Sequence, residues 1–235
     1  MDSHLLDWIA SVDRSTTICL NGIELLPHAL VQILNGLAVN AMPRGLPIFL
    51  PFAWIWRSAD ANRRNRMLAG VLATCVAVFL SIELQHHLQI HVRPFLDRSL
   101  AITVLKPDLK GGWDHPWSFP SDTATLYFAL AAIVFRENKL LGALSFAWAV
   151  LVVGVLRVVI GFHYPTDIVA GVVLGVGTVL LARQVGFDHL LGRVTRRLSP
   201  AVADAAVLVF LLDAYSLFPG AQGILHVASD FIHTV

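Results

Sequence analysis

Five side chains that could bind or transfer a phosphoryl group are spread over three stretches of the sequence. Arg157 precedes His163 by six positions, and Asp167 follows that histidine by four. Arg93 follows one apolar run, and Ser121 precedes another. Guanidinium groups bind phosphate oxygens in pairs, and a histidine with a carboxylate behind it can act as a nucleophile. In combination these residues predict a phosphoryl site.

Each of these residues also has an ordinary structural explanation. An arginine at the end of a membrane helix commonly extends toward lipid headgroups, and a serine before a helix is normally an N-cap. A histidine four residues from an aspartate is common by chance. The phosphoryl interpretation therefore depends on all five residues converging on one face of the protein. Pro165 breaks the preceding helix, Thr166 can cap a new one, and Asp167 lies in the first turn of that helix. The N-cap at Ser121 leaves backbone N–H groups that attract an anion.

The composition indicates a membrane protein. Apolar residues make up 56% of the 235-residue chain and charged residues 14%, whereas an ordinary soluble domain has about 25% charged residues. The formal net charge of +1 argues against nucleic acid as a partner. Cys19 and Cys75 are too few and too isolated for a disulfide framework or a zinc site. The N-terminal residues lack the basic stretch and cleavage site of a removable signal peptide.

Apolar runs predict an all-α transmembrane helix bundle with six to seven spans, since each span needs about 20 residues. The candidate spans are 42–56, 67–92, 121–135, 140–160, 166–183 and 201–219. Segment 18–40 is interrupted by polar residues, so it is either a tilted, partly polar span or an amphipathic helix in the membrane interface. The chain then divides into an N-terminal segment (1–41), a transmembrane core (42–185) and a C-terminal part (186–235) with a basic loop, an extra helix and a tail.

Basic residues predict the orientation of these spans. They cluster in three segments, which lie on the same side of the membrane if successive spans alternate in direction. The segments contain Arg57, Arg63, Arg64 and Arg66; Arg136 and Lys139; and Arg183, Arg193, Arg196 and Arg197. Positive residues favour the cytoplasmic side. Segments 93–120 and 161–165, which hold the candidate site, then share the opposite face. We expect a protein of the inner or plasma membrane whose site faces the periplasm or the outside.

The three stretches resemble the sequence blocks of the type-2 phosphatidic acid phosphatase superfamily, which includes membrane lipid phosphatases and vanadium haloperoxidases. The third block of that family, Ser-Arg-x5-His-x3-Asp, matches Arg157, His163 and Asp167 with its spacing intact. The second block, Pro-Ser-Gly-His, corresponds to residues 120–123. The first, Lys-x6-Arg-Pro, corresponds to residues 86–94.

The resemblance implies a role for each matching residue. His163 would attack phosphorus to form a phosphohistidine that water then hydrolyses, and Asp167 would orient its ring. Arg157 would complete the catalytic set. The residues that would bind phosphate are Arg93, Arg157, Ser121, Asp122 and His86. No metal is expected, since no cluster of carboxylates appears at the outer face, and no cofactor is expected.

Two positions depart from the family pattern. His86 stands where the family has lysine, and Thr123 stands where it has the histidine that is understood to protonate the leaving group. A threonine hydroxyl cannot act as a general acid near neutral pH. Either His115 or Asp122 supplies the proton, or the substrate does not need it.

Leaving-group chemistry favours a lipid diphosphate, because a phosphate with a second pKa of about 6 departs more readily than an alkoxide. We therefore expect hydrolysis of a polyprenyl or other isoprenoid diphosphate, or of a lipid phosphate. Two alternatives stay open: a lipid phosphotransferase, and a weakened member that binds or transports a phospholipid headgroup. The expected partners are the phosphorylated lipid and membrane lipids; the sequence does not indicate an oligomeric state.

Overall fold

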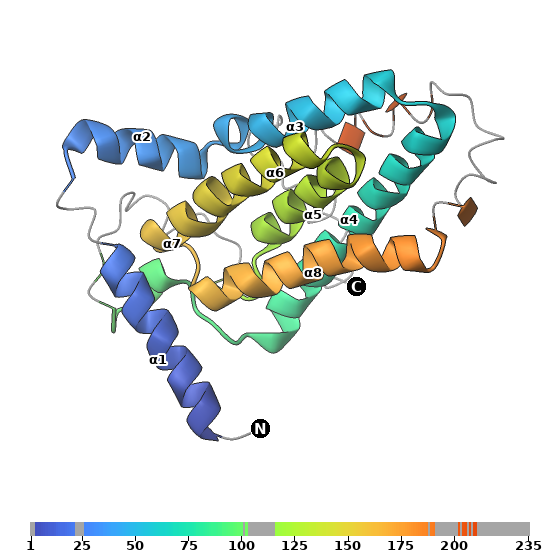
Figure 1. Ribbon diagram of the computed structural model, residues 1–235. Helices are drawn as coiled ribbons and strands as arrows, with labels where there is room; N and C mark the ends of the chain where they lie inside the picture. The colour runs from blue at the N-terminus through green and yellow to red at the C-terminus, as the bar shows by residue number, and fades with distance from the viewer. Residues whose placement is uncertain are drawn as a thin grey trace.

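The protein is helical in the computed structural model, which describes residues 3–21, 26–100, 102, 116–187 and 189–190, together with 202, 204–205, 207 and 209–210. The helices form one bundle (Figure 1). Within these ranges the only β-type pairing is an isolated antiparallel bridge between Val92 and Trp117. The predicted all-α class is confirmed.

The helices include three stretches that are long and apolar enough to cross a membrane: Ala61–Leu88, Lys139–Val159 and Pro165–Gln184. The elements in chain order are α1 (Ser3–Leu20), α2 (His28–Val39), α3 (Ala41–Ser58), α4 (Ala61–Leu88), η2 (Pro94–Leu96), α5 (Asp122–Glu137), α6 (Lys139–Trp148), η4 (Ala149–Val155), α7 (Leu156–Val159) and α8 (Pro165–Gln184). The short π-helical element η4 joins α6 to α7, so these three form one span. The larger number of six to seven spans stays a prediction.

Two of the predicted segments are wrong at their boundaries. Segment 18–40 is not one helix, because α1 ends at Leu20 and α2 begins at His28. The span predicted as 67–92 ends at Leu88, because Gln89 adopts a left-handed conformation with φ 49° and terminates α4. The last predicted span, 201–219, lies mostly outside the described residues.

Helix α5 lies at the centre of the bundle and packs against α3, α4, α6 and α8 (Figure 1). It approaches α8 closely because Gly171 and Gly175 have no side chain. A Cβ at Gly171 would lie 2.5 Å from the carbonyl oxygen of Ser121, and one at Gly175 would lie 2.3 Å from that of Thr125. Small residues at this spacing let membrane helices pack tightly. As a result the two helices begin side by side, and Ser121 N donates to Asp167 O at 3.0 Å.

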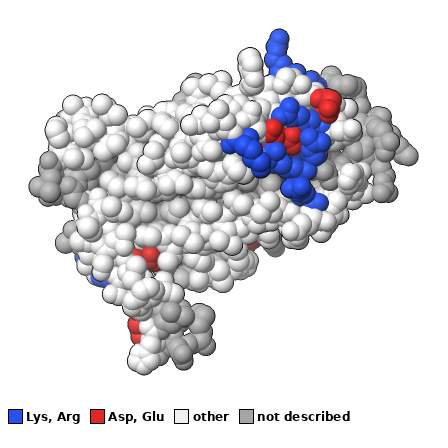
Figure 2. All heavy atoms as spheres, viewed as in Figure 1, with Lys and Arg blue, Asp and Glu red and all other residues white. Residues whose placement is uncertain are grey.

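The two ends of the bundle differ in charge. At the end where α4 begins and α5 finishes, Arg63 Nε and Arg66 Nη2 lie 2.9 and 3.1 Å from Glu137 Oε2. Figure 2 shows Lys and Arg side chains gathered over this region. The opposite end is formed where α4 finishes and where α5 and α8 begin. That end holds all three stretches that the sequence singled out as reactive.

Helix α1 contacts the rest of the bundle through polar side chains. Its apolar Trp8 and Ile18 are 63% and 49% exposed, whereas Asp13 is 2% exposed. The Asp13 carboxylate accepts a hydrogen bond from Thr166 N at 3.1 Å, and Asn21, just after the helix, donates to a backbone carbonyl of α7 at 2.8 Å. Through these contacts α1 packs beside the starting turn of α8.

Candidate active site

His163 lies in the short turn between α7 and α8 and is fully buried. The turn depends on Gly161, whose φ of +76° is accessible to glycine at little cost. Nδ1 of His163 lies 3.1 Å from the carbonyl oxygen of Ser118 and 3.6 Å from Asp167 Oδ2. A proton on Nδ1 can point only toward these acceptors, so Nε2 keeps its lone pair. Nε2 is therefore the ring nitrogen whose lone pair is available.

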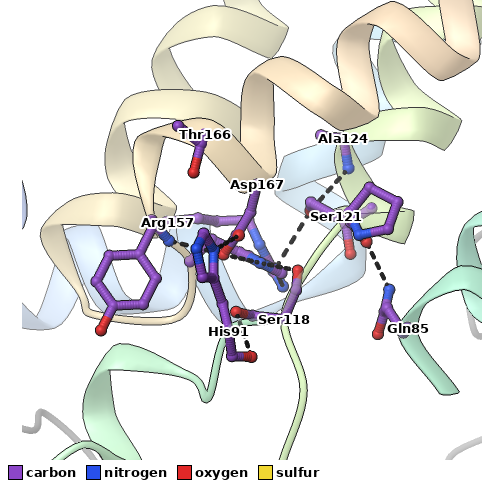
Figure 3. A network of polar contacts seen from close by, with 12 residues as sticks. Gln85, His91, Ser118, Ser121, Ala124, Arg157, Thr166 and Asp167 are labelled. Atoms are coloured by element: carbon purple, nitrogen blue, oxygen red, sulfur yellow. Dashed lines mark hydrogen bonds and ion pairs between the residues drawn. The ribbon is translucent and has the colours of Figure 1, made fainter. Parts of the chain in front are cut away.

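The Nε2 side of His163 faces groups that bind anions. Arg157 Nη2 lies 3.1 Å from Nε2, and Ser121 Oγ lies 3.2 Å from it. Ser121 caps α5, because its Oγ accepts a hydrogen bond from Ala124 N at 3.3 Å. Figure 3 shows how Arg157 and Ser121 reach this point from different helices. An anion at Nε2 would meet a guanidinium group, a hydroxyl group and the N-terminus of a helix.

The electrostatic surroundings keep His163 neutral at physiological pH. Burial lowers the pKa of His163 to about 4, and the charges of Arg157 and Arg93 act in the same direction against the carboxylate of Asp167. A histidine can attack phosphorus only through an unprotonated nitrogen. The environment thus maintains the reactive form of the ring.

Arg93 reaches the site from the segment after α4, where backbone contacts fix its position. Its N–H donates to Pro116 O at 2.9 Å, and Phe95 N donates to Gly161 O at 2.9 Å. These bonds join the first stretch to the second and third. Arg93 is 3% exposed, and burial lowers its pKa, although the negative charge of Asp122 opposes this change.

Asp167 is fully buried and lies between two histidines. Its Oδ1 is 2.7 Å from His91 Nδ1, and its Oδ2 is 3.6 Å from His163 Nδ1. Oδ2 also accepts a hydrogen bond from Tyr164 N at 2.8 Å. Burial alone would lower the pKa of His91, but the hydrogen bond and the charge of Asp167 raise it overall. The carboxylate is thereby held on both oxygens, which fixes the ring of His163.

Several supporting residues were not predicted from the sequence. His91 contacts Asp167, as described above, and Asp13 of α1 accepts from the start of α8. Gln85 Nε2 of α4 donates to Pro120 O at 2.7 Å and so holds the turn that precedes α5 (Figure 3). Only Gln85 gave a usable signal, because a polar amide late in a long apolar run usually faces the interior of a bundle.

His86 and Arg93 are seven residues apart, so a helix continued through both would place them on the same face, and this prediction is wrong. Helix α4 ends at Leu88, so Arg93 belongs to the following loop and the two-turn spacing does not apply. The structure places the His86 side chain in a partly exposed position. Its neighbour Gln85 is the residue of this turn that contacts the backbone of the site.

Thr123, which stands where the family has its acidic histidine, lies in the first turn of α5. Asp122 begins this helix next to Ser121, and Thr123 Oγ1 donates to Asp122 Oδ1 at 3.4 Å. Both residues are partly exposed, which leaves their side chains accessible at the site end. His115, the other residue considered as a proton source, lies outside the described residues.

A helical membrane bundle that buries a histidine against an arginine and a capped helix is the arrangement expected of a membrane phosphatase. The chain belongs to the PAP2 superfamily, whose family model matches residues 66–190. It is also 29% identical over 156 residues to the bacitracin transport permease protein BcrC of Bacillus licheniformis, covering 62% of this chain and 72% of that protein. No solved structure matches. Membership of this family supports a lipid phosphatase as the general class of protein.

Proposed function

We propose that the protein hydrolyses a lipid diphosphate at the outer face of the membrane through a phosphohistidine on His163. The observation that carries the proposal is the difference between the surroundings of the two ring nitrogens of His163. Nδ1 faces Ser118 O at 3.1 Å, whereas Nε2 faces Arg157 Nη2 at 3.1 Å and Ser121 Oγ at 3.2 Å. One side of the ring is held and the other is directed at anion-binding groups.

The arrangement supports a two-step reaction. Nε2 of His163 attacks the terminal phosphorus, the N–P bond forms, and the bond to the bridging oxygen breaks with its electron pair on the lipid monophosphate. Asp167 stabilises the positive charge that the ring acquires, and His91 holds that carboxylate in place. Arg157 and Arg93 neutralise the phosphoryl oxygens. Water then attacks phosphorus, releases inorganic phosphate and restores the neutral ring.

The residue at the acid position favours a diphosphate substrate. Thr123 cannot protonate a leaving alkoxide, and general acid catalysis typically contributes about 10²–10⁴-fold. A leaving phosphate with a pKa of about 6 gains much less from a proton. Cleavage of the phosphoanhydride therefore tolerates Thr123 better than cleavage of a phosphomonoester does. Transfer of the phosphoryl group to another lipid would share the first step.

A second candidate function is binding or transport of a phospholipid headgroup without turnover. The name of the Bacillus licheniformis relative describes that protein as a transport permease. Binding requires the arginines and the helix N-terminus, but it does not require a buried neutral histidine oriented by a carboxylate. The geometry of His163 and Asp167 therefore favours hydrolysis.

Phosphate release by the detergent-purified protein tests the proposal. A farnesyl or longer polyprenyl diphosphate should release phosphate faster than the matched monophosphate. His163→Ala should abolish release, and His189→Ala, which changes an exposed histidine after α8, should not. Equal release by wild type and His163→Ala would refute the proposal. Saturable binding of the lipid without release would favour the headgroup-binding function instead.

A further inference from the structure

A third arginine lies inside the bundle near the start of α3, outside the residues that match the family. Arg44 Nη1 donates to Ala38 O at 3.0 Å, and its guanidinium group lies over the ring of Tyr127, 5.5 Å from the centroid. Trp148 Nε1 donates to the carbonyl oxygen of Arg44 at 3.0 Å. Contacts from α2 and α5 therefore hold this side chain, and a contact from α6 holds its backbone.

Arg44 shares its surroundings with Arg157. Ala38, which accepts the hydrogen bond from Arg44, packs in one buried cluster with Leu156 and Phe162. The ring of Phe162 lies 5.2 Å from the guanidinium group of Arg157. Two like charges inside one bundle repel each other, and an anion between them would remove that repulsion.

Three buried polar atoms in this region have no hydrogen-bond partner among the described residues. They are Arg44 Nε, Arg157 Nε and the hydroxyl oxygen of Tyr127, whose side chain is 1% exposed. Buried polar groups in folded proteins nearly always have partners, so each such atom calls for an explanation. All three atoms carry a hydrogen to donate, and the oxygens of a phosphate accept several hydrogen bonds at once.

We propose that Arg44, the Tyr127 hydroxyl and Nε of Arg157 form a second phosphate subsite, which binds the phosphate that stays on the lipid when a diphosphate is cleaved. This inference rests on the function proposed above and names the part of the substrate that a monophosphate lacks. Arg157 joins the two subsites, because its Nη2 lies beside the nucleophile His163. Its Nε serves the second phosphate.

The second subsite would also explain how the reaction proceeds with Thr123 in place of an acid. When the P–O bond breaks, the electron pair moves to the bridging oxygen of the lipid monophosphate. A fixed guanidinium group stabilises that developing charge as a proton would. Arg44 stands on α3, whose Leu46 and Leu50 are 41% and 58% exposed. The lipid chain can therefore leave toward an apolar helix face that adjoins the subsite.

Paired substrates test the subsite directly. In detergent micelles, Arg44→Gln should lower kcat/KM for a lipid diphosphate by about 10²–10³-fold, as removal of one oriented donor does in other active sites. The same change should leave kcat/KM for the monophosphate nearly unaltered. Tyr127→Phe, which removes only a hydroxyl group, should lower the diphosphate value by about tenfold. Arg57→Gln, near the other end of α3, is the matched control and should alter neither value.

A binding measurement separates failure of this inference from failure of the proposed function. Methylenediphosphonate, a diphosphate analogue that cannot be cleaved, should raise the Tm of His163→Ala more than inorganic phosphate does. Adding Arg44→Gln or Tyr127→Phe to that variant should remove this difference. If wild type releases no phosphate, hydrolysis is refuted while the binding result still tests the subsite. Equal losses of kcat/KM on both substrates in Arg44→Gln, or no loss on either, would overturn the proposed subsite. If Arg44→Gln fails to fold, the same comparison is made with Tyr127→Phe.

Discussion

Both ends of the bundle concentrate arginine, but they hold it in different ways. At the basic end, the side chains of Arg63 and Arg66 are 30% and 36% exposed and share one carboxylate, Glu137. At the site end, Arg157 is 3% exposed and its Nη2 contacts the neutral ring of His163. The Glu137 carboxylate is 4% exposed, so the charges of two arginines balance one buried negative group. A buried guanidinium group beside a neutral partner is costly unless an anion joins it.

The difference shows that a basic residue near a helix end lies in one of two settings in this chain, a partly exposed surface or a buried site. At the basic end, Arg136, Lys139 and Arg183 line a groove between α5, α6 and α8. Figure 2 shows Lys and Arg side chains gathered in one large area of the surface. Such a surface suits the cytoplasmic interface of a membrane protein. The arginines of the site are enclosed by helices, where their positive charge can neutralise an anionic substrate.

The strongest way to test the comparison is to ask which side of the membrane each end faces. In a protein with Cys19→Ser and Cys75→Ser, single cysteines can replace Ser99 at the site end and Gln184 at the basic end; both positions are exposed. We expect Ser99→Cys to react with a membrane-impermeant thiol reagent in intact cells. Gln184→Cys should react only after permeabilisation. Reversed labelling would place the site in the cytoplasm and refute the proposed orientation.

Matched arginine substitutions test whether the two ends differ in function. Arg157→Gln should lower phosphate release by about 10²–10³-fold, because it removes an oriented donor from the phosphoryl oxygens. Arg157→Lys should restore little, because an ammonium group cannot form the same fork. Arg63→Gln, which breaks a partly exposed pair with Glu137 and leaves Arg66 beside that carboxylate, should retain nearly full activity. A comparable loss in Arg63→Gln would mean that both ends act through overall stability, which the Tm of each variant would reveal.

Much of the helical framework could be predicted from the sequence, because apolar runs and block spacings are local features. The span predicted as 166–183 is α8 (Pro165–Gln184), and the run 140–160 corresponds to the stretch Lys139–Val159. The third block likewise places His163 near Asp167 through a single turn at the start of α8. The error at the end of α4 arose because the left-handed cap at Gln89 leaves no mark in an apolar run.

The supporting contacts of the site could not be predicted, because they join distant parts of the chain. His91 and Asp167 are 76 positions apart, and Asp13 and Thr166 are 153 apart. Each pairing depends on how the helices pack, for example on the close approach of α5 and α8 at Gly171. Periodicity describes one helix at a time and carries no information about such partners.

Substitution of Thr123, at the acid position, should change the rate of hydrolysis by a smaller factor. Thr123→His should raise hydrolysis of a lipid monophosphate by about tenfold or more, because a histidine can protonate the leaving alkoxide. Diphosphate hydrolysis should change little, since a phosphate leaving group needs less help. The ratio of the two rates measures this effect independently of protein yield. If wild type already cleaves both lipids equally fast, another group supplies the proton, and Asp122→Asn is the next variant to measure.

The smallest predicted effect concerns His91 and the pH dependence of stability. Its pKa is raised above the ordinary value of about 6.5 by Asp167, despite the opposing effect of burial. The pairing therefore stabilises the fold fully below about pH 6.5, and this contribution is lost as pH rises through the raised value. His91→Asn keeps a group that can donate to Asp167 but does not titrate. The free energy of unfolding should differ between wild type and His91→Asn by about 1 kcal/mol near pH 5.5 and by less near pH 8.5. His189→Asn, at an exposed position, should show no such change. A difference that stays constant with pH would show that His91 acts by packing alone and that Asp167 does not depend on its charge.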